Sequence, residues 1–227
     1  MEEPTPVIIQ QKPYEYTISY VPIEPKKAKI YFSKKEIKHL TVAALLVTAV
    51  GLSFIGFSNI FSNDYTLLAS FIIIFTASFF MHEIAHKIAA QMRGFWAEFR
   101  LTIMGALLTL ISVISPFFKI ISPGAVMISG FADSEKIGKI SIAGPTTNIT
   151  LATIFLAITF LLPQYSSIFT LGAAFNAWIA LFNLIPFGML DGFKVFLWSK
   201  KLWTLAFTAS LVLTITSYGI LLRGNPW

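Results

Sequence analysis

Two histidines and a glutamate near the middle of the chain have the spacing of a metal-dependent hydrolase. His82, Glu83 and His86 form an HExxH pattern inside the apolar run from Thr66 to Met92. On a helix, residues four apart lie on one face, so both imidazoles can bind a single zinc ion. The carboxylate of Glu83 beside them can act as general base toward water at the metal. The pattern predicts zinc-dependent hydrolysis.

A catalytic zinc ion usually has three protein ligands, so the chain should supply one more. The sequence contains no cysteine, which leaves His, Asp or Glu as the third ligand. Asp191 is the best candidate, because it closes an apolar run in which Pro186 and Gly188 should break the helix and turn its end inward.

The remaining candidates for the third ligand fit less well. His39 lies beside a lysine at the mouth of the first apolar run, where an interfacial histidine is the simpler interpretation. Asp64 is expected at the opposite face of the membrane, and Asp133 and Glu135 in a polar loop.

The composition places this site in a membrane. Of 227 residues, 56% are hydrophobic and 12% are charged, whereas a soluble domain averages about a quarter charged residues. The apolar residues fall in blocks long enough to cross a hydrocarbon core of about 30 Å, which takes about 20 residues of helix. The net charge of +6 comes from basic residues at the ends of these blocks, which suits lipid headgroups and not nucleic acid.

We expect an all-α polytopic membrane protein, a bundle of about five to six transmembrane helices with a small β or re-entrant element after the HExxH helix. The expected full spans are residues 39–61, 66–92, 139–162, 166–187 and 202–222, and the shorter run is 101–118. In the polar segment before them, the alternating pattern from Tyr14 to Tyr20 predicts a strand. Ser33 followed by Glu36 resembles a capping box that opens a helix.

The topology depends on the run 101–118. If this run dips into the membrane and returns, the lysines that precede and follow the later spans all lie on the cytoplasmic side, as the positive-inside rule favours. The HExxH helix and the span before Asp191 then end on that same side. If the run crosses, the two lie on opposite faces and cannot share an ion. The charge pattern and the metal hypothesis agree on the non-crossing alternative.

Three motifs, in this order, resemble the site-2 protease family of intramembrane zinc metalloproteases. The HExxH of residues 82–86 is the first. The segment Gly144-Pro145-Thr146-Thr147-Asn148 is similar to the family's GPxxN, and residues 183–192 look like its NxxPxxxLDG. Residues 123–128 resemble the strand or hairpin that many small members place before the GPxxN span.

The resemblance implies a zinc metalloendopeptidase that hydrolyses a peptide bond in or near a transmembrane segment of another protein. Its one zinc ion (Zn²⁺) would be bound by His82, His86 and Asp191, and Glu83 would activate the water. Asn148 would lie near the site, to bind the substrate strand or the oxyanion. The implied partners are a transmembrane protein substrate and the lipid bilayer, with no nucleic acid.

Two other functions are open at this stage: a CAAX-processing type of membrane zinc protease, and a metal or proton transporter. The HExxH glutamate and the absence of a repeated half argue against the transporter. The expected organisation is a cytoplasmic N-terminal segment (1–38), a transmembrane metalloprotease domain (39–222) and a short tail (223–227). The expected location is the cell membrane, multi-pass, with the N-terminus and the active site on the cytoplasmic side.

Overall fold

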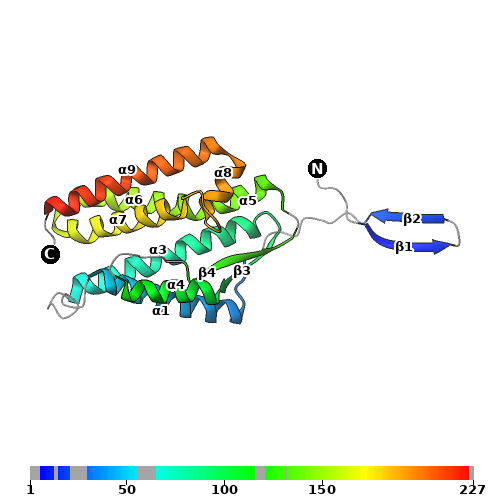
Figure 1. Ribbon diagram of the computed structural model, residues 1–227, viewed down its shortest axis with the longest axis horizontal. Coiled ribbons are helices and arrows are strands. Elements are labelled where there is room, and N and C mark those ends of the chain that lie inside the picture. The colour runs from blue at the N-terminus through cyan, green and yellow to red at the C-terminus, as the bar shows by residue number, and fades with distance from the viewer. Residues whose placement is uncertain are drawn as a thin grey trace.

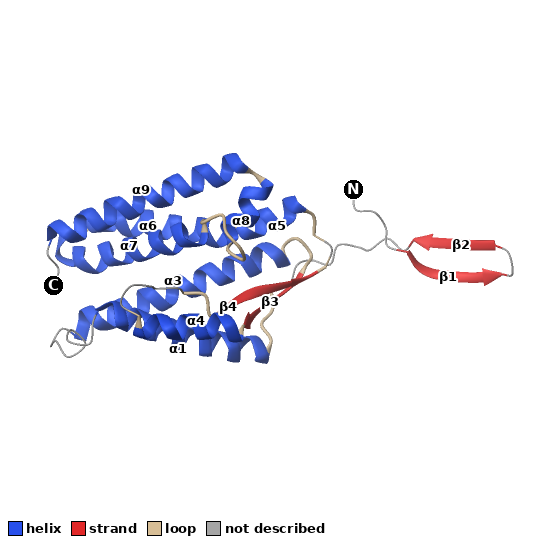
Figure 2. Cartoon of the chain, viewed as in Figure 1, coloured by secondary structure: helices blue, strands red, loops and turns tan. Residues whose placement is uncertain are grey.

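The computed structural model describes residues 6–12, 15–20, 30–55, 65–115, 121–130 and 132–224. Most of these residues are helical (Figure 2). The helices are α1 (Lys34–Ile55), α3 (Tyr65–Gln91), α4 (Ile103–Ile114), α5 (Ser134–Ser141), α6 (Ala143–Leu161), α7 (Ser166–Asn183), α8 (Asp191–Trp198) and α9 (Lys200–Gly224). The strands are β1 (Pro6–Lys12), β2 (Glu15–Tyr20), β3 (Trp96–Leu101) and β4 (Gly124–Ser129), and a 3₁₀ turn spans Pro163–Tyr165.

Five helical segments of the described chain are long and apolar enough to cross a bilayer, which confirms the five expected spans. They cover residues 34–53, 68–91, 134–161, 163–183 and 200–223. The first begins five residues before the expected start at residue 39, because Ser33 Oγ accepts the backbone N–H of Glu36 at 3.1 Å and opens the helix there. The third consists of α5 and α6, which meet at Ile142.

The run 101–118 does not form a spanning helix in its described part. Helix α4 has 12 residues, which at 1.5 Å per residue reaches about 18 Å and is too short to cross a bilayer. On either side of it, β3 and β4 pair antiparallel, with Trp96 opposite Ser129 and Leu101 opposite Gly124. The expected β or re-entrant element after the HExxH helix is therefore confirmed as a strand, a short helix and a returning strand.

The strand expected over residues 14–20 is present as β2, and it pairs antiparallel with β1. No pattern in the sequence had indicated β1. The two strands form a sheet of their own, separate from the β3–β4 sheet.

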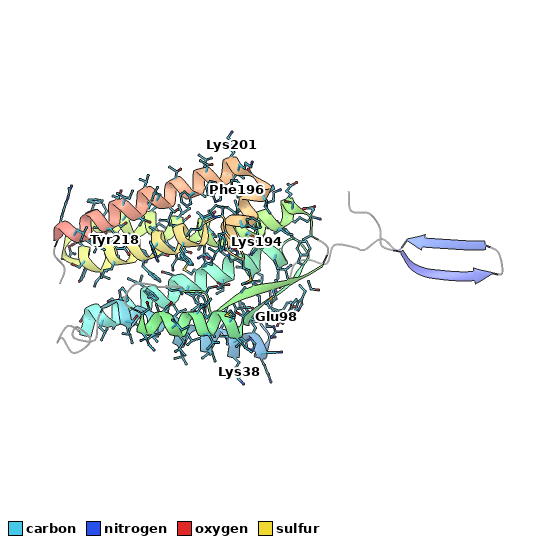
Figure 3. The ribbon with its side chains drawn as sticks, in the orientation of Figure 1. Lys38, Glu98, Lys194, Phe196, Lys201 and Tyr218 are labelled. Atoms are coloured by element: carbon cyan, nitrogen blue, oxygen red, sulfur yellow. The ribbon has the colours of Figure 1, made fainter. Side chains whose placement is uncertain are left out.

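The helix directions bring the ends that carry the basic residues together. In Figure 1, α1, α6 and α9 begin, and α3 and α7 end, toward the same end of the bundle. The labelled side chains of Lys38, Lys194 and Lys201 lie toward this end, and Tyr218 lies toward the other (Figure 3). This arrangement agrees with the non-crossing topology. That this end faces the cytoplasm stays a prediction.

The two-stranded β3–β4 sheet is attached to the helices by its β3 edge. Glu36 Oε1 on α1 accepts the backbone N–H of Phe99 at 2.9 Å, and His39 Nδ1 accepts that of Leu101 at 3.1 Å. The other oxygen of Glu36 pairs with Lys87 on α3, and both side chains are buried. Helix α1 thus covers the edge of β3 that does not pair with β4.

Candidate metal centre

The two histidines of the HExxH pattern lie near the end of α3 with their rings turned toward each other. Their Nε2 atoms are 3.1 Å apart, and the ring planes cross at 79°. Both residues are buried, with 4% of His82 and 7% of His86 exposed. One helical turn separates them, so the helix itself sets this convergence.

Asp191 reaches the same point from the other half of the bundle. Helix α7 ends at Asn183, and the chain then turns through Gly188, whose φ of 58° is a left-handed conformation that glycine adopts readily. Helix α8 begins at Asp191, whose Oδ2 lies 2.9 Å from His86 Nε2 and 3.5 Å from His82 Nε2. The three ligand atoms lie within 4.8 Å of one another, a group that could hold a metal ion.

The surroundings of Asp191 keep it ionised. Burial by itself raises the pKa of this carboxyl, but the adjacent His86, the hydrogen bonds with both histidines and the cation of Lys194 together hold its pKa well below the usual value. Lys194 Nζ lies 3.5 Å from Oδ1, the oxygen that faces away from the histidines. A carboxylate in this state is a ligand for a cation.

The second nitrogen of each imidazole has a hydrogen-bond partner outside the centre. His86 Nδ1 donates to the backbone carbonyl of Ile140 at 2.8 Å, and His82 Nδ1 lies 2.5 Å from Oδ1 of Asn148. A histidine that donates through Nδ1 keeps the lone pair of neutral Nε2 for a metal. Both lone pairs then point at Asp191.

The space for an ion is bounded by Gly144, near the start of α6. A Cβ at this position would overlap with Nε2 of His86 and lie 2.7 Å from Nε2 of His82. Two neutral imidazole nitrogens and one carboxylate oxygen form a donor set that zinc prefers for hydrolysis. The residues present therefore fit a zinc ion, and the glycine of the GPxxN segment leaves room for it.

A cavity opens beside these three side chains. Its lining includes Glu83 and Lys194, the turn residues Asn183 and Met189, and several residues of β4 and its approach, namely Ser122, Gly124, Ala125, Val126 and Ile128. Within the described chain, Glu83 has neither a hydrogen bond nor an ion pair, so its carboxylate is available to the cavity.

The other residues considered as a third ligand have different partners. His39 accepts the backbone N–H of Leu101, Asp133 caps α5 by accepting the N–H of Lys136 at 2.7 Å, and Glu135 pairs with Lys139 at 2.5 Å. Asp64 lies outside the described residues.

Asn148 does not line the cavity. Its side chain is fully buried behind His82, with Oδ1 bonded to that ring and Nδ2 to Asn176 at 2.8 Å. The substrate or oxyanion contact that the resemblance implied for Asn148 stays a prediction. Lys194 was not singled out from the sequence, although its position three residues after Asp191 on a helix is a usable signal.

One relative of this chain has a name that refers to function. A protein of Methanocaldococcus jannaschii named "putative zinc metalloprotease" is 32% identical over 181 residues, which cover 77% of this chain and 90% of that protein. No family model matches the sequence. No solved structure matches this chain.

Proposed function

Because this chain belongs to the same zinc metalloprotease family as the Methanocaldococcus jannaschii protein, we propose that it is an intramembrane protease of the site-2 type. Its substrate is a membrane protein, which it cuts in or beside a transmembrane segment. The observation that carries this proposal is the meeting of His82 and His86 with Asp191 where two apolar helices, α3 and α7, end beside a cavity.

The residues divide the work of peptide hydrolysis among them. His82, His86 and Asp191 would hold the zinc ion. When bound, zinc supplies a Lewis acid that polarises the peptide carbonyl and makes water more acidic. Glu83 takes the proton from the attacking water on its carboxylate and passes it to the leaving amine.

The substrate chain has to be extended when it reaches this centre, because a helix hides its amides in its own hydrogen bonds. Strand β4 lines the cavity, and among the described residues it pairs with β3 alone. Its other edge can add an extended segment through main-chain hydrogen bonds. The side chains that decide which segment is accepted are those along β4 and the turn before Asp191.

Glu83→Gln tests the proposal. The purified variant should bind zinc as the wild type does and lose cleavage of a model membrane substrate by about 100-fold or more, the scale of a general base. The matched control is Glu135→Gln, an exposed glutamate on α5, which should keep full activity. A Glu83→Gln protein that cleaves at the wild-type rate would exclude this mechanism, and zinc transport by both proteins without cleavage would favour a transporter.

A further inference from the structure

A series of buried hydrogen bonds links His82 to the helices across the bundle. Its Nδ1 lies 2.5 Å from Oδ1 of Asn148 on α6, whose Nδ2 lies 2.8 Å from Oδ1 of Asn176 on α7. Both asparagine side chains are 0% exposed. A buried amide can face its neighbours in two ways that differ by a flip, so the direction of each bond has to be set by something that cannot flip.

At the far end of this series, the side-chain amide of Asn176 has one permitted orientation. Nδ2 of Asn176 lies 2.9 Å from the backbone carbonyl of Gly172 and 2.8 Å from Oγ of Ser78. The hydroxyl of Ser78 donates its proton to the carbonyl of Ile74 at 2.7 Å, so its oxygen can only accept from Asn176. Because both neighbours are acceptors, the NH₂ group of Asn176 faces them and its oxygen faces Asn148.

The orientation of Asn176 fixes the orientation of Asn148, and Asn148 in turn fixes the tautomer of His82. The NH₂ group of Asn148 faces the oxygen of Asn176, so its own oxygen faces His82 and accepts from Nδ1–H. A neutral imidazole has one N–H, so Nε2 keeps its lone pair. A flipped Asn148 would present NH₂ to Nδ1, and the ring proton would move to Nε2, where it would point into the metal centre.

We propose that Asn176 is a positioning residue for the metal centre, and that it acts through Asn148 to hold His82 in the tautomer whose Nε2 binds the metal. This inference rests on the proposed function, because it takes zinc as the ion bound there. The other acceptor for the Asn148 NH₂ group, the backbone carbonyl of Ser78, is 3.4 Å away and too weak to hold the amide alone. His86 needs no such relay, because a backbone carbonyl accepts its Nδ1–H directly.

Two variants separate this role from simple packing. Asn176→Leu keeps the branched shape and the number of side-chain heavy atoms, in a larger side chain, and frees Asn148 to flip, so the dissociation constant for Zn²⁺ should rise about tenfold or more. Adding Asn148→Asp should restore zinc binding to within about threefold of wild type, because the introduced carboxylate can only accept from Nδ1–H whichever way it faces. The measurement is competition between the purified protein and a zinc chelator of known affinity.

The control is Thr170→Val, which removes a polar contact between the same two helices. Its hydroxyl lies 3.3 Å from that of Thr159 on α6, away from the ligands, and its loss should leave zinc affinity unchanged. Wild-type zinc affinity in Asn176→Leu would overturn the inference. So would a loss that Asn148→Asp does not restore, since that result is what a packing role predicts.

A second measurement needs no variant. The chain has three histidines, so nitrogen NMR of the zinc-free wild type in detergent can assign the ring protons, and His82 should carry its proton on Nδ1. A proton on Nε2 in the zinc-free protein would overturn the inference without bearing on the proposed function. A wild-type protein that binds no zinc would overturn the proposed function, and this inference with it.

Discussion

Gly144 on α6 lies against the imidazole of His86 on α3, so close that a methyl group at position 144 would overlap with Nε2 of that ring. The same group would lie 2.7 Å from Nε2 of His82. The missing side chain is thus on the edge of the histidine pair that faces Asp191. The glycine of the GPxxN segment therefore leaves space where the ion would be held.

Gly144→Ala should therefore weaken zinc binding more than it weakens the fold. The added methyl group displaces both rings from the geometry in which they share an ion, and a drop of at least about tenfold in zinc affinity is expected. Chelator competition on the purified protein measures it. Gly219→Ala on α9 is the control, because a Cβ there meets nothing within 4 Å. Equal zinc affinity in the two variants would contradict this interpretation of Gly144.

The buried pair of Glu36 and Lys87 should be a major contribution to the stability of the β3–β4 sheet. Glu36→Leu leaves the ammonium of Lys87 without its partner and the N–H of Phe99 without its acceptor, so the free energy of unfolding should fall by about 3–5 kcal/mol. Glu36→Gln keeps one acceptor oxygen, so one of these two groups stays bonded and the loss should be smaller. Thermal unfolding in detergent compares them.

Adding Lys87→Met to Glu36→Leu should recover part of that stability, since no unpaired charge is then buried. Glu135→Gln serves as the exposed control, because its ion pair with Lys139 lies at the surface and should contribute less than about 1 kcal/mol. If Glu36→Leu unfolded at the same temperature as this control, the pair would have no structural role.

Cleavage should depend on how easily the substrate helix unwinds. Two model substrates that differ at one position near the scissile bond, with Gly in one and Leu in the other, should be cut at different rates. Glycine costs a helix interior about 1 kcal/mol relative to alanine, which corresponds to about fivefold in the population of opened substrate. The rates are compared in the same vesicles at equal substrate density. Equal rates would show that unwinding does not limit the reaction.

Zinc should stabilise the folded protein, because the three ligands come from α3 and α8 and meet only when the bundle has formed. At a free zinc concentration about 100 times the dissociation constant, the expected gain is about 2.7 kcal/mol. A chelator should therefore lower the unfolding temperature, and added zinc should restore it. His86→Ala should show no such response, and a wild-type protein indifferent to the chelator would argue against a bound ion.

Several features of this fold can be predicted from the sequence because each is encoded locally. The five spans follow from continuous apolar blocks, and the convergence of His82 with His86 follows from the pitch of one helix. The end of α7 at Asn183 follows from Pro186 and Gly188. The non-crossing element after α3 followed from charge counting, because lysines are costly to export.

Other features depend on partners far along the chain, and no local pattern carries them. Ser33 does cap α1, but Glu36, expected to complete a capping box, turns instead to Lys87 and Phe99. Asn148 was expected near the site, but no pattern indicated that its bonds with His82 and Asn176 would form a series that ends on the histidine. The orientation of each buried amide depends on which of its neighbours can only accept a hydrogen bond. Those neighbours are known only once the fold is known.

The most direct test of the central claim is the zinc content of the purified protein with and without Asp191. The wild type should contain about one zinc ion per chain, and Asp191→Ala should lose it, because a catalytic site needs three protein ligands. Asp133→Ala, which removes the exposed cap of α5, should keep its zinc. Zinc bound to Asp191→Ala at the same stoichiometry and affinity as to the wild type would contradict the claim that this carboxylate and the two histidines share one ion.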